Sequence, residues 1–309
     1  MLPPRDHLDK PTRKLLAAPA KVRIRHIQKD RFIPTRAIQS VLELVDSFVT
    51  RPVSIRPRCL ALVGEAGSGK STLMEEIERR YRQSGESGSK LVAYCTLDPH
   101  PDVRVSQRTL LTALGVPRAV SLFQPRVNGD DLIRRSLHEL GTRLVIFDEG
   151  LHLSNLDRSA RALVWDWIKW VSTANRVSVV CAGIPGFEQT ILQEPQLQTR
   201  FQIIRLPRWT PGPAFAQFLT AYERSLPLQR PSALHTQATQ EALLRESALG
   251  QGAVGITHGI KQVIESAAIA AIQTGAERVT LSLLPAWRED LESLVSVKVR
   301  RRQPRRARA

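Results

Sequence analysis

Two periodicities of hydrophobic residues alternate along the first two thirds of the chain. Short, nearly continuous apolar runs that suit buried parallel strands are separated by segments whose apolar residues recur every three or four positions, as in amphipathic helices. Strands that alternate with helices predict an α/β domain with a five-stranded parallel sheet. The predicted strands are residues 58–64, 90–97, 143–149, 176–183 and 201–206, and the predicted helices are residues 38–49, 70–83, 104–114, 130–140, 158–173 and 187–192.

The pattern changes after Pro207, where the strand signals stop. Only helical patterns follow, broken at prolines and at the glycine-containing residues 250–259, and they predict a smaller all-helical domain. The N-terminal residues are rich in Pro, Lys and Arg, with a short apolar alternation at residues 22–27, and predict an arm that packs late or against a partner. The expected division is a basic arm at 1–35, the α/β domain at 36–208, the helical domain at 209–296 and a basic disordered tail at 297–309.

The charge of the chain is strongly positive. Its 309 residues contain 45 Lys and Arg against 29 Asp and Glu, a net charge of +16, which is typical of proteins that bind a polyanion such as nucleic acid. Seven of the basic residues lie in the last twelve positions, so more than half of the net charge belongs to the rest of the chain. The charge therefore indicates a polyanion partner even without the tail.

Neither a membrane segment nor a signal sequence is predicted. No apolar run reaches the roughly 18 residues that a membrane helix needs, and the N-terminus has no apolar segment of the signal type, so we expect a cytoplasmic protein without a membrane partner. Cys59, Cys95 and Cys181 are far apart and each lies in or beside an apolar run. We interpret them as buried thiols, since their spacing does not suit a metal site.

A glycine-rich stretch, GEAGSGKST at residues 64–72, follows the first predicted strand and opens a predicted helix. Two glycines that bracket four residues, followed by Lys and Ser, are typical of a phosphate loop, whose backbone N–H groups and lysine bind nucleotide phosphates. We therefore expect an ATP site in which Lys70 reaches the β- and γ-phosphates and Ser71 binds Mg²⁺. The predicted ATP-binding residues of this loop are Gly64, Glu65, Ala66, Gly67, Ser68, Gly69, Lys70, Ser71 and Thr72.

Two consecutive acids, Asp148 and Glu149, end the most hydrophobic predicted strand. A phosphate loop needs a second acid to hold the metal, so we predict that Asp148 binds Mg²⁺ together with Ser71 and that Glu149 orients or deprotonates the attacking water. The end of the next strand offers only Cys181 where related pockets place a polar side chain that senses the γ-phosphate. This favours slow hydrolysis that DNA or a partner stimulates.

An arginine, Arg200, stands just before the last predicted strand. An arginine at this point of such a domain commonly faces the nucleotide of a neighbouring subunit, so we predict that Arg200 is catalytic, together with Lys70 and Glu149. The alternative interpretation of Arg200 is a surface salt bridge.

Several segments resemble the AAA+ ATPases of DNA transposons, specifically the TniB type, which is related to TnsC. The phosphate loop and the acid pair are generic to many ATPases, whereas the N-terminal arm, RLPRW and SLPLQRPS are more specific. The resemblance rests on RIRHIQKDRFIPTRAI (23–38), GEAGSGKST (64–72), TALGVP (112–117), RLVIFDE (143–149), AGIPGFE (182–188), QLQTRFQIIRLPRW (196–209) and YERSLPLQRPS (222–232).

This resemblance implies a P-loop AAA+ core followed by a helical lid domain, and a protein that assembles on double-stranded DNA in the ATP state. The homo-oligomer would be a ring or helical filament that recruits or activates a transposase, with a target-selection protein as a further partner, while hydrolysis controls assembly and disassembly. Arg200 would act on the adjacent protomer. DNA contacts would come from residues 98–108, which supply Arg104 and Arg108.

The sequence departs from the family at two places. The family usually has Asp, Glu, an apolar residue and then His or Gln, whereas here Gly150 and Leu151 separate the acids from His152. Many related ATPases place an arginine in the helical domain that contacts the γ-phosphate, whereas this chain offers His258 and Lys261. These three residues therefore receive no firm role.

Other classes of phosphate-loop protein remain as alternatives. A helicase loader or replication-initiator ATPase shares the expected fold, oligomer and DNA, but would carry a helix-turn-helix or a helicase-binding arm. A small-molecule kinase would carry an arginine-rich lid over its substrate. A non-catalytic adaptor would have lost the lysine or the acids, which are intact here.

Overall fold

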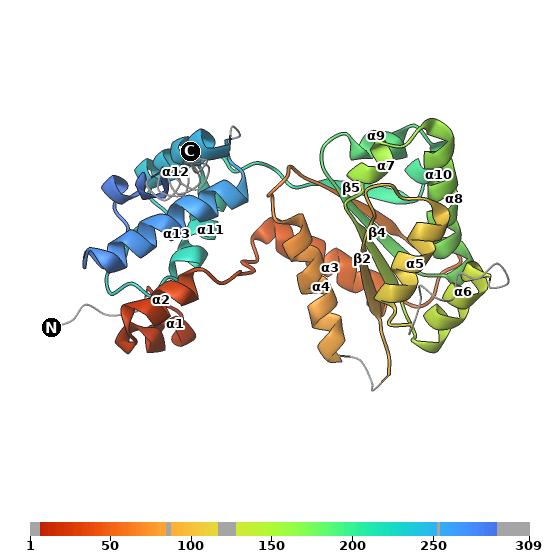
Figure 1. Ribbon diagram of the computed structural model, residues 1–309, viewed down its shortest axis with the longest axis horizontal. Helices are drawn as coiled ribbons and strands as arrows, with labels where there is room; N and C mark the ends of the chain where they lie inside the picture. The colour runs from red at the N-terminus through yellow and green to blue at the C-terminus, as the bar shows by residue number, and fades with distance from the viewer. Residues whose placement is uncertain (1–6, 85–87, 117–127, 252–253, 289–309) are drawn as a thin grey trace, which may run out of the picture. The chain divides into compact units, whose positions relative to one another are not determined.

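The computed structural model describes residues 7–84, 88–116, 128–251 and 254–288. The chain divides into two compact units, which are visible in Figure 1: residues 36–207, here called the sheet unit, and residues 1–35 together with 208–309, the helical unit. The predicted tail, the last residues of the predicted helical domain and Pro117 lie outside the described residues. None of the helices in the described part of the chain has the length and apolar character needed to cross a membrane.

The sheet unit is built on five parallel strands in the order β2-β3-β4-β1-β5, which confirms the predicted sheet. Parallel strands present all their first residues at one edge of the sheet, here called the amino edge, and all their last residues at the carboxyl edge. The strands are β1 (Cys59–Val63), β2 (Val92–Thr96), β3 (Leu144–Asp148), β4 (Ser178–Gly183) and β5 (Phe201–Arg205).

Helices cover the sheet because the three inner strands β1, β3 and β4 are buried throughout and need apolar contact on both faces. Figure 1 shows α3 and α4 on one side of the strands and α5, α6 and α8 on the other. The short helices α7 and α10, of four residues each, were not predicted. The helices of this unit are α3 (Arg36–Thr50), α4 (Lys70–Ser84), α5 (Val103–Ala113), α6 (Gly129–Glu139), α7 (Leu151–Ser154), α8 (Arg158–Asn175), α9 (Phe187–Leu192) and α10 (Pro195–Gln198).

The core beneath α8 contains the three cysteines and a cluster of aromatic rings. All three thiols are free and buried, as predicted, and burial raises the pKa of each of them. Trp165 stacks on Phe187 with 6.0 Å between the ring centres and meets Phe201 edge-on at 5.6 Å. Such contacts hold α8 and α9 against the sheet.

The helical unit combines the C-terminal helices with the N-terminal residues. Residues 22–27, where the sequence shows a short apolar alternation, are helical: Arg23 and Ile27, four residues apart, form the buried face of α2 while Val22 is exposed. The elements of this unit are α1 (Lys10–Lys14), η1 (Leu15–Ala17), α2 (Ala20–Ile27), α11 (Pro213–Glu223), α12 (Gln237–Gln251), α13 (Thr257–Gln273) and η2 (Leu281–Leu283).

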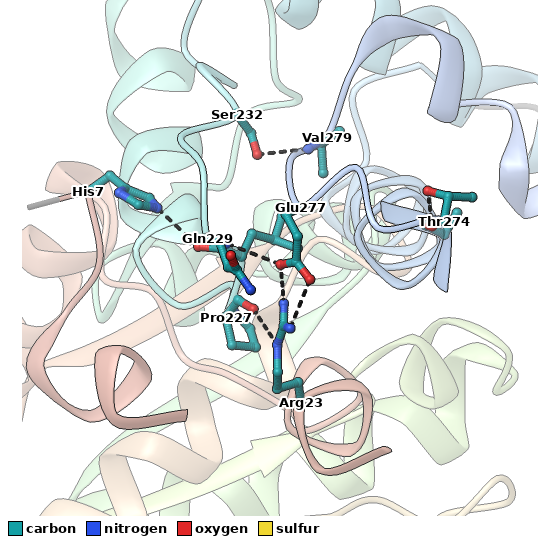
Figure 2. Close-up of polar contacts among 10 residues, drawn as sticks. His7, Arg23, Pro227, Gln229, Ser232, Thr274, Glu277 and Val279 are labelled. Atoms are coloured by element: carbon teal, nitrogen blue, oxygen red, sulfur yellow. Dashed lines mark hydrogen bonds and ion pairs between the residues drawn. The ribbon is translucent and has the colours of Figure 1, made fainter. Parts of the chain in front are cut away.

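A buried ion pair ties the N-terminal residues to this unit (Figure 2). The guanidinium of Arg23, whose residue is only 5% exposed, donates to both carboxylate oxygens of Glu277 and, at 2.9 Å, to the carbonyl oxygen of Pro227. Glu277 also accepts the backbone N–H of Gln229 at 3.3 Å. The described part of the segment predicted as an arm is thus packed into the helical unit.

Two of the more specific segments of the sequence also stabilise the helical unit. In YERSLPLQRPS, the buried carboxylate of Glu223 accepts the backbone N–H groups of Ser232, Ala233 and Leu234 at 2.6 to 3.1 Å. In RLPRW, the backbone N–H of Trp209 donates to the carbonyl oxygen of Gly255 at 2.8 Å. Residues of both segments therefore make hydrogen bonds that stabilise the helical unit.

Candidate nucleotide-binding site

The glycine-rich loop leaves β1 at the carboxyl edge of the sheet. The backbone N–H of Gly64 donates to the carbonyl oxygen of Gly183 on the neighbouring strand at 3.1 Å, and α4 begins at Lys70. Gly67 and Gly69 have φ values of 75° and 95°, a left-handed conformation that glycine adopts without strain. A β-carbon on Gly64 would lie 2.6 Å from the Ser68 hydroxyl, so the tight turn requires glycine there.

Lys70, 8% exposed, holds its ammonium group against the loop. Its Nζ donates to the carbonyl oxygens of Gly64 at 2.8 Å and Glu65 at 3.0 Å. Burial lowers the pKa of Lys70, while the negative charges of Asp148, Glu149 and Glu65 oppose that shift. These carboxylates favour the charged lysine, the form that attracts phosphate.

Asp148 ends β3 with its carboxylate fixed by two hydrogen bonds. The residue is 2% exposed; its Oδ2 accepts the hydroxyl of Tyr94 at 3.0 Å, and its Oδ1 accepts the backbone N–H of Glu149 at 2.8 Å. Burial, and the nearby charge of Asp148, raise the pKa of Tyr94, which keeps the hydroxyl protonated as a donor. Sequence reasoning missed Tyr94, because a tyrosine inside a strand is also typical of a core residue.

Glu149 occupies a turn that exposes its side chain directly after Asp148. Its φ of 58° is left-handed, which is uncommon for a residue with a β-carbon and is found more often at functional sites. The turn is secured by Gly150, whose N–H donates to the carbonyl oxygen of Ala182 at 2.7 Å and whose α-carbon packs against Phe187.

The residues at this edge fit a nucleotide phosphate and a hard cation. Lys70 and the loop amides supply positive charge, Ser71 is exposed in the first turn of α4, and each oxygen of Asp148 keeps acceptor capacity beyond its one hydrogen bond. Hydroxyl and carboxylate oxygens are the ligands that Mg²⁺ prefers. Ser71 and Asp148 thus remain the predicted metal ligands, and residues 64–72 the predicted phosphate site.

Arg200 lies at the other edge of the sheet. It directly precedes β5, its carbonyl oxygen accepts the N–H of Cys59 at the start of β1 at 3.2 Å, and its guanidinium donates to the Thr173 hydroxyl at 2.6 Å. Five strand residues at about 3.3 Å each put about 16 Å between the two edges. The structure therefore brings Lys70, Asp148 and Glu149 together and does not bring Arg200 to them.

The remaining predicted or unassigned polar residues have these surroundings. Arg104 and Arg108 are exposed on α5, whose first turn is capped by the Asp102 side chain. His152 is half-buried in α7. Lys261 belongs to the helical unit, where its Nζ pairs with Asp30 at 2.6 Å.

Comparison with known proteins agrees with the fold. Residues 23–211 match the family described as Bacterial TniB protein. The chain belongs to the TniB family. A search among curated proteins gave no match.

Solved structures similar to this TniB protein are origin-recognition proteins of the AAA+ class. One is the ORC2 protein of Aeropyrum pernix, solved as ADPNP-ADP complexes. The superposition covers 85% of this chain and 70% of the ORC2 chain, with a TM-score of 0.61 and 17% sequence identity. For the ORC1 protein of the same organism, in complex with DNA, the superposition covers 91% of this chain and 72% of the ORC1 chain, with a TM-score of 0.55 and 18% identity. For Drosophila ORC bound to DNA, the superposition covers 93% of this chain and 69% of the ORC chain, with a TM-score of 0.56 and 12% identity. At these identities the likeness concerns the fold, which is that of an AAA+ P-loop ATPase with a five-stranded parallel sheet and a smaller helical part.

Proposed function

We propose that this TniB protein is an ATP-dependent, sequence-nonspecific DNA-binding regulator of transposition. It assembles on target DNA with ATP bound, as a ring or helical filament, and recruits or activates the transposase; hydrolysis then controls assembly and disassembly. The observation that carries the proposal is the placement of the catalytic groups on opposite edges of one sheet. Since Arg200 lies about 16 Å along the strands from the phosphate loop, its guanidinium serves the ATP of another copy.

Binding of ATP is assigned to the phosphate loop and the first turn of α4. Lys70 exchanges its bonds to the loop carbonyls for the β- and γ-phosphate oxygens, and the loop amides and the helix N-terminus add positive charge. Ser71 and Asp148 would hold Mg²⁺, which would neutralise charge on the phosphates. This assignment is supported by the buried, fixed carboxylate of Asp148.

Hydrolysis is assigned to Glu149, whose exposed carboxylate stands beside the metal ligand Asp148. Glu149 orients the attacking water and accepts its proton as the bond to the γ-phosphorus forms and ADP leaves. Tyr94 is a positioning residue, because its hydroxyl fixes the carboxylate of Asp148. Since the end of β4 offers only the buried Cys181 at the sensor position, we expect slow turnover that DNA or a partner stimulates.

Coupling of turnover to assembly follows from Arg200. An arginine supplied by a second subunit stabilises the charge of the phosphoryl-transfer transition state and is worth roughly 10³-fold or more in rate. Each copy thus hydrolyses ATP only while a neighbour is in place. Dissociation after hydrolysis would then reset the assembly.

DNA binding is supported by the net charge of +16 and by the DNA-bound proteins that share the fold. Contacts of Lys and Arg to the phosphate backbone are independent of sequence and weaken steeply with salt, which suits a protein that loads on arbitrary targets. Arg104 and Arg108 remain the proposed DNA contacts. The protein acts in the cytoplasm, and a target-selection protein is a further partner of the assembly.

A second candidate, a helicase loader or replication-initiator ATPase, is favoured by the likeness to ORC structures. The TniB family match over residues 23–211 favours transposition instead. The two candidates separate in a reconstituted reaction, because only a transposition regulator stimulates strand transfer by its transposase.

The test of the proposal is electron microscopy of the protein on random-sequence duplex DNA with a non-hydrolysable ATP analogue, with ADP and without nucleotide. We expect rings or filaments with the analogue alone. A Lys70→Ala variant, which lacks the phosphate contact, is the matched control and should form none. Isolated particles under all three conditions would contradict the proposal.

A further inference from the structure

A concave basic surface lies at the amino edge of the sheet unit, where Arg200 stands. One hollow of about 300 Å³ is lined by Arg56, Pro57, Arg58, Gln196, Thr199 and Arg200. A second hollow of about 270 Å³ shares residues 56–58 and adds further arginines from the start of β3 and the end of α8. The six arginines of this surface are Arg51, Arg56, Arg58, Arg143, Arg176 and Arg200.

Among the residues that the structure describes, no carboxylate compensates these arginines. Neither hollow is lined by Asp or Glu. Within the described part of the chain none of the six pairs with a carboxylate; Arg143 donates to the carbonyl oxygen of Arg51, and Arg200 to the Thr173 hydroxyl. Like charges held together without counter-charge repel one another, so the surface gains most from a bound anion.

The backbone brings Arg58 beside Arg200. Cys59 on β1 lies opposite Phe201 on β5, and the residues just before them are Arg58 and Arg200. Neighbouring strands lie about 4.8 Å apart, so the two arginines start from adjacent points of the edge. Arg56 lines the same hollow. Three guanidinium groups with fifteen N–H donors, about five each, can thus converge on one phosphate group.

We propose that this hollow is a binding site for the phosphates of ATP held by a second copy of this chain, and that Arg56 and Arg58 contact them together with Arg200. The inference rests on the proposed function and extends it from one trans-acting arginine to three. The occupant is a second copy because its carboxyl edge carries the complementary charge: Asp148, Glu149 and the nucleotide phosphates.

Apolar side chains on the same loop also favour a protein partner. Ile55 is 76% exposed and Val53 is 53% exposed, and Val53 lines the second hollow among the arginines. Exposed branched apolar side chains beside arginines suit the surface of another protein, whereas a DNA backbone offers them only phosphate and sugar. A second copy therefore accounts for both the charge and the apolar residues.

The test replaces Arg56 and Arg58 with Gln and measures ATP turnover on DNA, ATP affinity and DNA affinity at several salt concentrations. We expect at least a tenfold loss of turnover, with ATP affinity, DNA affinity and its salt dependence unchanged. Adding the Glu149→Gln chain, which keeps its arginines, should restore turnover in the mixture. Arg135→Gln, an exposed arginine on α6, is the matched control and should keep wild-type turnover.

The results that differ from these expectations separate the inference from the proposed function. Unchanged turnover in the double variant, where Arg200→Ala abolishes it, overturns this inference and leaves the proposed function standing. Unchanged turnover in Arg200→Ala overturns the proposed function itself. A weaker, less salt-dependent affinity for DNA assigns the hollow to nucleic acid and overturns the inference. If the double variant does not fold, the single variant Arg56→Gln, at an exposed position, replaces it. We then expect ATP turnover to fall at least threefold, and unchanged turnover would contradict the inference.

Discussion

The two edges of the sheet carry opposite chemistry. At the carboxyl edge, the negative charges of Asp148 and Glu149 act on the ammonium of Lys70, whereas the amino edge gathers six arginines without a carboxylate among the lining residues. Unlike edges of this kind suit a head-to-tail interface, in which the carboxyl edge of one copy meets the amino edge of the next. The difference is what our proposal requires, in which the sheet unit holds two halves of one ATPase site and another copy completes each half.

Head-to-tail association has a geometric consequence. Such interfaces generate a ring if the rotation between copies closes and a helical filament if it does not. Both forms use the same two edges, so both would couple ATP turnover to the presence of a neighbour. The predictions below separate the contributions of the edges, from the largest effect to the smallest.

Removing the ammonium of Lys70 from the carboxyl edge should have the broadest effect, because both turnover and assembly require bound ATP in our account. Lys70→Ala deletes the ammonium that contacts the loop carbonyls and, in our account, the phosphates. We expect ATP affinity to fall about 100-fold or more, because a charge-assisted contact of about 3 kcal/mol is lost. Titration with a fluorescent ATP analogue measures it; wild-type affinity would exclude this loop as the phosphate site.

Removing Arg200 from the amino edge should leave ATP binding intact and lower turnover. We expect Arg200→Ala to reduce the rate per chain roughly 10³-fold with an unchanged affinity for ATP. Steady-state turnover on DNA, with binding measured separately, checks the expectation. A fall in affinity without a fall in rate would mean that the arginine stabilises the domain instead.

Replacing the exposed acid should trap the assembled state. Glu149→Gln keeps the size of the side chain but cannot accept a proton, so we expect a rate loss of about 10²-fold or more. Rings or filaments should then persist with ATP as they do for the wild type with a non-hydrolysable analogue. Disassembly at the wild-type rate would show that hydrolysis does not control release.

Arg23, which is paired with a carboxylate, should contribute to stability, unlike the arginines of the amino edge, for which we expect effects on ATP turnover. Arg23 is buried against Glu277, so Arg23→Ala leaves a partly buried carboxylate unpaired, and we expect a loss of about 3 kcal/mol in stability. Arg25→Ala, an exposed arginine on the same helix, is the matched control and should change stability by less than about 0.5 kcal/mol. Denaturant unfolding measures both. Equal losses would contradict the structural role of the pair.

The smallest expected effect concerns pH and the carboxylate of Glu265. Burial raises its pKa above the ordinary 4.5, so the folded protein keeps a proton that the unfolded chain releases. Its stabilising effect is complete below pH 4.5 and is lost as pH rises through the folded pKa. Glu265→Gln should remove this decline, and unfolding followed from pH 4 upward measures it. The same slope in both proteins would contradict the assignment.

The fold could be predicted from the sequence where buried residues form a continuous apolar run. The strands of a parallel sheet are apolar on both faces, so runs such as RLVIFDE define their ends within about two residues. Helix α2 was missed because its buried face includes Arg23, which the pattern counts as polar. Two partners more than two hundred residues away, the carboxylate of Glu277 and the carbonyl oxygen of Pro227, make that burial favourable.

The candidate site could be predicted only where its residues are adjacent in sequence. Lys70 and Asp148 belong to local motifs whose spacing is typical of phosphate and metal binding. The hollow at the amino edge gathers arginines from separate segments, including Arg58 and Arg200, so only the strand register brings them together. Tyr94 likewise needed the pairing of β2 with β3.

The central claim is that each ATP site is completed by the amino edge of another copy. The most direct test mixes Arg200→Ala, whose own carboxyl edge is intact, with Glu149→Gln, whose arginines are intact, and measures ATP turnover on DNA. Random mixing places a competent pair at about a quarter of the interfaces of a head-to-tail assembly, so we predict about a quarter of the wild-type rate from two proteins that are inactive alone. A mixture no more active than its separate components would contradict the account.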